Sequence, residues 1–94
     1  MPKHLCGRVE GKSTIGRSGL AVHVTAGFID PGFHGQITLE LVNHKQAKPF
    51  VLRPGMLIAQ ITFHSLAHTP RRLYGDPALG SHYQGQLGAT PPAK

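Results

Sequence analysis

Glu40 is the residue whose type and setting best suit proton transfer. It is one of only four acidic residues and lies in the segment QITLELVN at residues 36–43, where apolar and polar side chains alternate. This alternation predicts a strand with Ile37, Leu39 and Leu41 facing the core and Gln36, Thr38 and Glu40 on the opposite face. A carboxylate on the wall of a cleft can move a proton to or from a bound water. A lone Glu is more often a solvated strand residue, so the residue alone leaves both roles open.

A second group of candidate residues lies in the segment EGKSTIGR at residues 10–17. Backbone N–H groups, the Ser13 hydroxyl and the Arg17 guanidinium together are what a phosphate or an oxyanion requires. The run from Gly11 to Ser13 matches the end of a P-loop. That motif needs a glycine where this chain has Cys6, and no βαβ pattern surrounds it. A P-loop is therefore excluded.

The seven histidines and the single cysteine do not form a zinc motif. No HExxH pattern is present, and the zinc deaminases need a PCxxC element that a chain with one cysteine lacks. His23 alternates with Val22 and Val24, which favours a hydrogen-bonded strand residue. Because Cys6 stands alone, no intrachain disulfide can form, and we expect a reducing, cytoplasmic location.

Composition limits the classes of protein and partner. Ninety-four residues suffice for one small domain, predicted over 1–94, and a formal charge of +6 fits a polyanionic partner. The basic residues are scattered and lack an aromatic-rich RNA-binding pattern, so charge alone leaves nucleic acid and nucleotide phosphates open. No apolar run is long enough to cross a membrane and no signal peptide follows Met1, so we expect a soluble protein.

Short strands and turns must position these residues, because twelve Gly and eight Pro interrupt the chain. No amphipathic helix is predicted, so the fold class is all-β. A small chain of this kind often needs oligomerisation to bury enough apolar surface. Strands are predicted over residues 20–25, 36–43, 50–52 and 57–63, turns at Asp30-Pro-Gly and Arg53-Pro-Gly, a loop over 44–48, and a mobile C-terminal tail over 75–94.

Five segments, in order, resemble the dCTP deaminase family. The likeness runs from about Leu5 to Pro91, and five ordered segments are more specific than any single motif. The segments are EGKSTIGR at 10–17, HVTAGFIDPGF at 23–33, QITLELVN at 36–43, RPGMLIAQ at 53–60 and GSHYQGQLGATP at 80–91.

The resemblance implies a distorted jelly-roll β-fold, or partial β-barrel, shared with the trimeric dUTPases. It implies a homotrimer whose active sites lie between subunits, and a flexible C-terminal tail that closes like a lid over bound nucleotide. The implied reaction is hydrolytic deamination of dCTP to dUTP and ammonia, a step in dUTP and dTTP precursor biosynthesis. Mg²⁺ would be carried on the triphosphate and no zinc would be needed. The implied partners are dCTP and dUTP, with neither nucleic acid nor membrane.

The same resemblance assigns roles to individual residues. Glu40 matches the residue that activates the water attacking C4 of cytosine, and Ser13 and Arg17 match residues that position and polarise the reacting centre. A Glu at this strand position also favours a deaminase over a dUTPase, in which the corresponding residue is usually apolar. Substrate contacts are implied for Lys12, Ser13, Thr14, Ile15, Gly16, Arg17, Asp30, Thr38, Leu39, Glu40, Gln60, Tyr74, His82 and Gln86.

The chain departs from the family pattern in three ways. Family members are longer and carry an N-terminal half, so we expect a truncated chain with unpaired sheet edges. His82 stands where the family usually has Lys, which predicts weaker phosphate binding near neutral pH. The chain ends in PPAK in place of the usual serine-arginine ending. The alternatives to a dUTP-forming deaminase are a dUTPase, a bifunctional deaminase and diphosphatase, or an inactive nucleotide-binding fragment.

Overall fold

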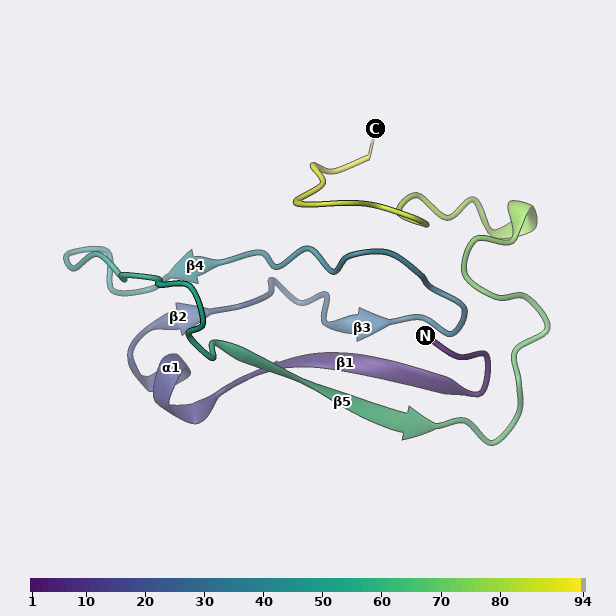
Figure 1. Cartoon of the computed structure of the whole chain (residues 1–94), viewed down its shortest axis with the longest axis horizontal. Coiled ribbons are helices and arrows are strands. Elements are labelled where there is room, and N and C mark those ends of the chain that lie inside the picture. Colours follow the sequence, from purple (N-terminus) through teal and green to yellow (C-terminus); the bar gives the residue numbers. More distant parts are fainter. Residues whose placement is uncertain (94) are drawn as a thin grey trace.

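A computed structural model describes residues 1–93, and these are mostly extended segments with one short α-helix (Figure 1). Their strands form a three-stranded sheet in the order β3-β1-β5 and a two-stranded sheet of β2 and β4. Neither sheet closes on itself, and the predicted all-β class is confirmed. No helix in this part of the chain is long and apolar enough to span a membrane.

The main sheet is built on two long antiparallel strands, β1 (Leu5–Gly11) and β5 (Ala59–Ser65). They pair without a break over all seven residues, from Leu5 opposite Ser65 to Gly11 opposite Ala59. On the other side of β1, the two-residue strand β3 (Phe28–Ile29) places Ile29 opposite Gly7. In Figure 1, β1 and β5 lie side by side along the length of the molecule.

The second sheet joins β2 (Leu20–Ala21) to β4 (Val42–Asn43). Between β1 and β2 the chain makes the helix α1 (Ser13–Arg17), which buries Ile15. The helix ends at Arg17 with Ser18 as its C-cap, and the chain turns at Gly19, whose φ of 102° is readily adopted only by glycine. The sequence did not predict α1, because a five-residue helix is too short to show helical periodicity.

The hydrophobic core is small. Val9, Val22 and Ile29 form its centre, with Phe33 and Leu39 among the side chains packed against them. Only six hydrophobic side chains are buried among the described residues, whereas twelve large ones are exposed. The chain therefore leaves much of its apolar surface uncovered, as the small size predicted.

Several sequence predictions are confirmed. Asp30 accepts a hydrogen bond from the Phe33 N–H at 3.1 Å and closes the predicted turn, in which Gly32 has a φ of 86°. The Arg53 carbonyl accepts from the Met56 N–H at 3.1 Å and closes the second turn. The loop over 44–48 is also present, and the strand predicted over 57–63 corresponds to β5, which runs from Ala59 to Ser65.

Three predicted strands are wrong in extent. Of residues 20–25 and 36–43 only β2 and β4 are paired, and residues 50–52 form no strand. Ile37 and Leu41, predicted to face the core, are 44% and 42% exposed. An alternating pattern indicates an extended backbone, but a β-strand also needs a neighbouring strand with which it can pair. Residues 36–40 instead bond to the tail and to residues 22–24.

The tail, predicted to lack regular structure, contains one 3-10 helix, η1 (Pro77–Leu79), and otherwise turns. It lies against residues 34–38, where the Gln36 N–H donates to the Gln86 carbonyl at 2.9 Å and the Gly85 N–H donates to the His34 carbonyl at 2.8 Å. Figure 1 shows the tail running above the segment that leads to β4. The last residue of the tail, Lys94, lies outside the described residues. The predicted mobility of the tail stays a prediction.

Candidate functional site

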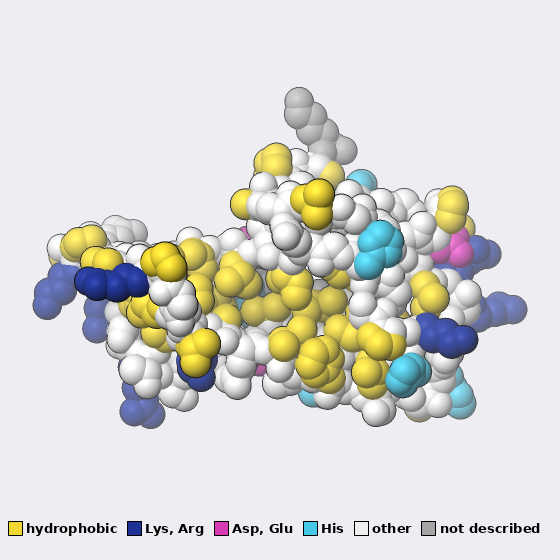
Figure 2. All heavy atoms as spheres, in the orientation of Figure 1, with side chains coloured by type: hydrophobic (Ala, Val, Ile, Leu, Met, Phe, Trp, Pro, Cys, Tyr) yellow, Lys and Arg dark blue, Asp and Glu magenta, His cyan; other side chains and the backbone are white. Residues whose placement is uncertain are grey.

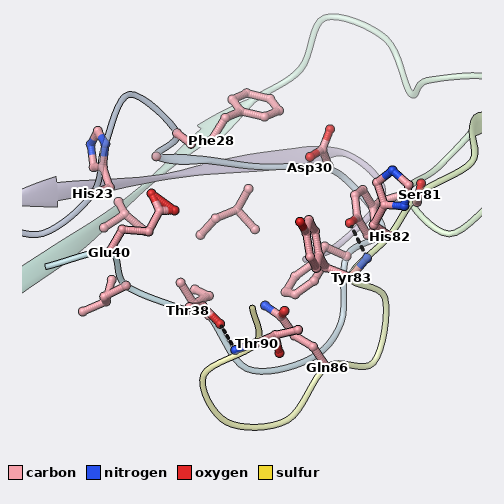
Figure 3. Close-up of a pocket in the computed structure, with 18 of the residues that line it drawn as sticks. His23, Phe28, Asp30, Thr38, Glu40, Ser81, His82, Tyr83, Gln86 and Thr90 are labelled. Carbon is pink, nitrogen blue, oxygen red and sulfur yellow. Dashed lines mark hydrogen bonds between the residues drawn. The ribbon is translucent and has the colours of Figure 1, made fainter. Parts of the chain in front are cut away.

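A cavity of about 800 Å³ lies between the core and the tail (Figure 3). Three parts of the chain form its walls: the sheet residues around β3, the extended segment 37–40 and the tail. The lining is mainly apolar but includes two acids, two histidines and several hydroxyl and amide groups. The polar and charged lining residues are His23, Asp30, Thr38, Glu40, Tyr74, Ser81, His82, Tyr83, Gln86 and Thr90.

Glu40 lies at one end of this cavity and is held by two hydrogen bonds to the segment 22–24. Its N–H donates to the Val22 carbonyl at 3.1 Å, and its Oε1 accepts from the Val24 N–H at 3.1 Å. The first bond fixes the backbone and the second fixes the carboxylate. Because the side chain is exposed and Oε1 is already oriented, the carboxylate can accept a proton from a water in the cavity.

His23 lies beside Glu40 at the same end of the cavity in Figure 3. The prediction that it is a hydrogen-bonded strand residue is wrong. It lies beyond β2, and its buried Nδ1 finds no hydrogen-bond partner among residues 1–93. The next turn is strained, since Thr25 has a φ of 55°, which a β-branched residue rarely adopts. Strain of this kind is often found at ligand sites.

The tail closes the opposite end of the cavity through side-chain contacts. The Thr38 hydroxyl donates to the Gly88 carbonyl at 3.3 Å and accepts from the Thr90 N–H at 3.2 Å. The Tyr83 N–H donates to the Tyr74 hydroxyl at 2.9 Å, and the Tyr74 ring packs edge-on against Phe33 at 5.4 Å between centroids. These contacts make the tail a wall of the site in this chain.

The structure gathers half of the predicted substrate-binding residues into this cavity. Its lining includes Asp30, Thr38, Leu39, Glu40, Tyr74, His82 and Gln86. Sequence reasoning did not include His23, Tyr83 and Thr90 among the site residues, although all three line the cavity. All three lie within segments that carried the family likeness, His23 in 23–33 and the other two in 80–91. The proximity of His23 to Glu40 could not be read from spacing.

The other predicted residues lie elsewhere. Lys12 and the α1 residues Ser13 to Arg17 do not line the cavity, and Ile15 is buried, which gives it a packing role. Gln60 is on β5, where its Nε2 donates to the Gly11 carbonyl at 2.8 Å and so contacts β1. Within one chain, therefore, Ser13 and Arg17 do not join Glu40.

No three His, Cys, Asp or Glu side chains within 1–93 are grouped closely enough to hold a metal ion. The two acids in the cavity, Asp30 and Glu40, lie at separate places on its wall. Carboxylate oxygens are a ligand type that Mg²⁺ accepts, so the two acids are compatible with this ion.

The chain is thus an all-β unit with a cavity that contains two acids and is closed at one end by its own tail. Comparison with known proteins identifies the family. The profile of the dCTP deaminase-like family matches residues 1–66, and the chain belongs to this family.

Curated relatives support the same assignment. A protein of Corynebacterium jeikeium is 54% identical over 91 residues, which are 97% of this chain and 48% of the relative. Proteins of Rhodococcus opacus and Nocardia farcinica are also 54% identical over 91 residues, covering 97% of this chain and 48% and 45% of the relatives. The chain thus spans about half the length of the curated relatives it matches. All three are named dCTP deaminase, dUMP-forming, so their named product differs from the dUTP expected above.

Proposed function

We propose that this chain carries the nucleotide-processing site of a dCTP deaminase that forms dUMP. The family membership and the names of the relatives support the substrate class and the product. The observation on which the proposal rests is the placement of Glu40, because a fixed carboxylate in a cavity is the group that a hydrolytic deamination needs.

The first step would replace the amino group of cytosine. Glu40 takes a proton from a water, the water oxygen bonds to C4, and the C4–N bond breaks as ammonia leaves with the added protons. The Val24 N–H holds Oε1 in place during this exchange. Thr38 and Leu39, which flank Glu40 along the same wall, would contact the base. The product of this step is the uracil nucleotide.

The second step would convert the triphosphate to dUMP. A second water attacks the phosphorus nearest the sugar, and diphosphate leaves, so that one dCTP and two waters give dUMP, ammonia and diphosphate. Mg²⁺ on the phosphates would neutralise the developing charge. His82 on the tail and the basic, hydroxyl-rich residues 12–17 are the groups that would bind the phosphates.

The separation of α1 from the cavity supports a site shared between copies. Ser13 and Arg17 can meet Glu40 only if α1 of another copy faces this cavity, since they do not line it in their own chain. The homotrimer implied by the family resemblance would supply such a neighbour. This assembly, like the roles of Ser13 and Arg17, remains part of the proposal.

The test is to incubate the purified chain with dCTP and Mg²⁺ and separate the nucleotides by anion-exchange chromatography. We expect dUMP to accumulate. Glu40→Gln should lower kcat by roughly 10²–10⁴-fold, the usual contribution of a positioned general base, while nucleotide binding changes little. The matched control is Glu10→Gln, which changes an exposed acid on β1 that does not line the cavity.

Each outcome bears on a different part of the proposal. Accumulation of dUTP without dUMP would overturn the product. Equal loss of activity in Glu10→Gln and Glu40→Gln would overturn the role of Glu40. Absence of any product from a chain that is folded by circular dichroism would contradict the claim that this chain carries the activity by itself.

A further inference from the structure

The side-chain amide of Gln84 bonds to three separate positions in the chain. Its Oε1 accepts a hydrogen bond from the His34 N–H at 2.9 Å. Its Nε2 donates to the carbonyl of Gly32 at 3.0 Å and to the carbonyl of Tyr74 at 3.0 Å. A side-chain amide has an acceptor oxygen and two N–H donors, so the oxygen and both donors of this group have partners. Gln84 therefore ties the tail to the turn at Gly32 and to the segment that carries Tyr74.

The backbone at Gly75 approaches the Gln84 side chain closely. A Cβ on Gly75 would lie 2.6 Å from Nε2 of Gln84 and 3.0 Å from its Cδ and its Cγ. The Gln84 side chain is half-buried there, and hydrogen bonds that are partly removed from water are electrostatically stronger than exposed ones. The absence of a side chain at residue 75 thus leaves the space in which the amide makes its three bonds.

Gln84 does not line the cavity, but the residues that it connects do. Asp30 lies in the turn that the amide contacts, and Tyr74 accepts one of the amide's bonds through its carbonyl. His82 and Gln86 each lie two residues from Gln84 along the tail. These four lining residues come from three parts of the chain that are distant in sequence. The amide of one residue outside the cavity therefore holds three parts of the cavity wall together.

The large aliphatic side chains of the tail bury little apolar surface. Its two leucines, Leu79 and Leu87, are 52% and 79% exposed. Figure 2, drawn in the orientation of Figure 1, shows exposed hydrophobic side chains on the tail at the top of the molecule. A segment with few buried apolar contacts opens readily unless other bonds hold it. Hydrogen bonds such as those of Gln84 therefore supply a large part of the attachment of the tail.

We propose that Gln84 is a positioning residue of the nucleotide site: its amide keeps the tail docked in the free chain and so sets the affinity for nucleotide. The inference rests on the proposed function, because it takes the cavity as the nucleotide site. When the binding-competent form of a protein is only partly populated, the apparent affinity falls in proportion to that fraction. Loss of the three bonds lowers the fraction of chains whose tail is docked, whereas bound nucleotide restores the docked tail. Gln84 therefore acts on affinity, and the chemical step stays with Glu40.

The first measurement follows the tail in the free chain with Gln84→Met. Methionine keeps the length of the side chain but lacks the amide that makes the three bonds. The reporters are the N–H groups of Gly85 and Gln36, which bond to the carbonyls of His34 and Gln86 and so join the tail to the chain without involving Gln84. Their amide hydrogen exchange should accelerate by about tenfold or more, as expected for the loss of several hydrogen bonds.

The second measurement separates nucleotide affinity from the chemical step. In Gln84→Met, the Kd for dCTP from calorimetry and the KM should rise by about threefold or more, while kcat at saturating dCTP stays within about twofold. Gln84→Glu should weaken binding more than Gln84→Met does. Its carboxylate still accepts from the His34 N–H but places an oxygen against the carbonyls of Gly32 and Tyr74. A role in packing alone would give the two variants equal effects.

The matched control is Gln46→Met, in the loop over 44–48, where the side chain is exposed and does not line the cavity. It should change exchange and affinity by less than about twofold, and exchange within β1 and β5 should be the same in every variant. Equal exchange at Gly85 in Gln84→Met and Gln46→Met would overturn the proposal, as would a loss of kcat with KM unchanged. The exchange measurement uses no nucleotide and decides the role of Gln84 in docking the tail even where the original chain binds no dCTP, a result that would contradict the proposed function instead.

Discussion

Gly27→Ala tests whether the close approach of β1 to the turn before β3 is required. A Cβ on Gly27 would lie 2.7 Å from the carbonyl oxygen of Val9 and 2.8 Å from Nε2 of His23. The first contact is with backbone and cannot be relieved by a side-chain rotation. The two segments cannot move apart freely either, because the Val9 N–H donates a hydrogen bond to the Gly27 carbonyl at 2.7 Å.

The expected cost follows from these two contacts. Overpacking of a close contact costs about 1–3 kcal/mol, and a weakened backbone hydrogen bond adds roughly 1 kcal/mol. We therefore expect the free energy of unfolding to fall by about 2–4 kcal/mol. For a domain of this size, each kcal/mol of lost stability lowers the midpoint temperature of thermal unfolding by about 4–8 °C. This midpoint should therefore fall by at least about 8 °C. The His23 ring should also move away from its place beside Glu40.

The matched control is Gly11→Ala, at the end of β1, where an added Cβ meets nothing within 4 Å. This change should leave stability unchanged or raise it by up to about 1 kcal/mol, because it restricts only the unfolded chain. Thermal and urea unfolding followed by circular dichroism would compare the two variants. If Gly27→Ala unfolds within about 0.5 kcal/mol of Gly11→Ala, the argument from the close approach fails.

Two further predictions concern the tail. Gln36→Ala removes the side-chain oxygen that accepts a hydrogen bond from the Gly88 N–H. Amide hydrogen exchange at Gly88 should then accelerate roughly fivefold, as expected for the loss of about 1 kcal/mol. If Gly88 exchanges no faster in this variant than in the loop variant Gln46→Ala, the prediction fails. His82→Lys places a permanent positive charge on the wall of the cavity, so dCTP should bind more tightly than to the original chain, as calorimetry at pH 8 would measure. A variant that binds no better than the original chain would refute this prediction.

Turns and family membership could be predicted from the sequence because both depend on local residue patterns. Asp30-Pro-Gly and Arg53-Pro-Gly form their turns through bonds within four residues. Strand pairing depends on residues far apart. The alternation in 36–43 gave the face shared by Thr38 and Glu40, both of which line the cavity. It could not show that most of this segment has no sheet partner.

The candidate site was predicted unevenly for the same reason. The residues around Glu40 and in the tail meet because the turn at Pro31 and the return of the tail bring three distant segments together. The family resemblance assigned Ser13 and Arg17 to a site between subunits, and α1 lies outside the cavity of its own chain. Motifs describe what a family shares, whereas the contacts of one chain depend on which parts of the assembly are present.

The bonding of residues 36–40 links the tail to the proposed catalytic residue. Gln36 and Thr38 bond to the tail, whereas Glu40 bonds to Val22 and Val24. The same extended segment is therefore held from one side by the tail and from the other by the turn that carries His23. A displacement of the tail would release Thr38, two residues from Glu40, and leave residues 38–40 held only through the bonds of Glu40 to Val22 and Val24. Closing the tail over a nucleotide would thus do more than exclude water: it would complete the support that positions the proton-accepting group.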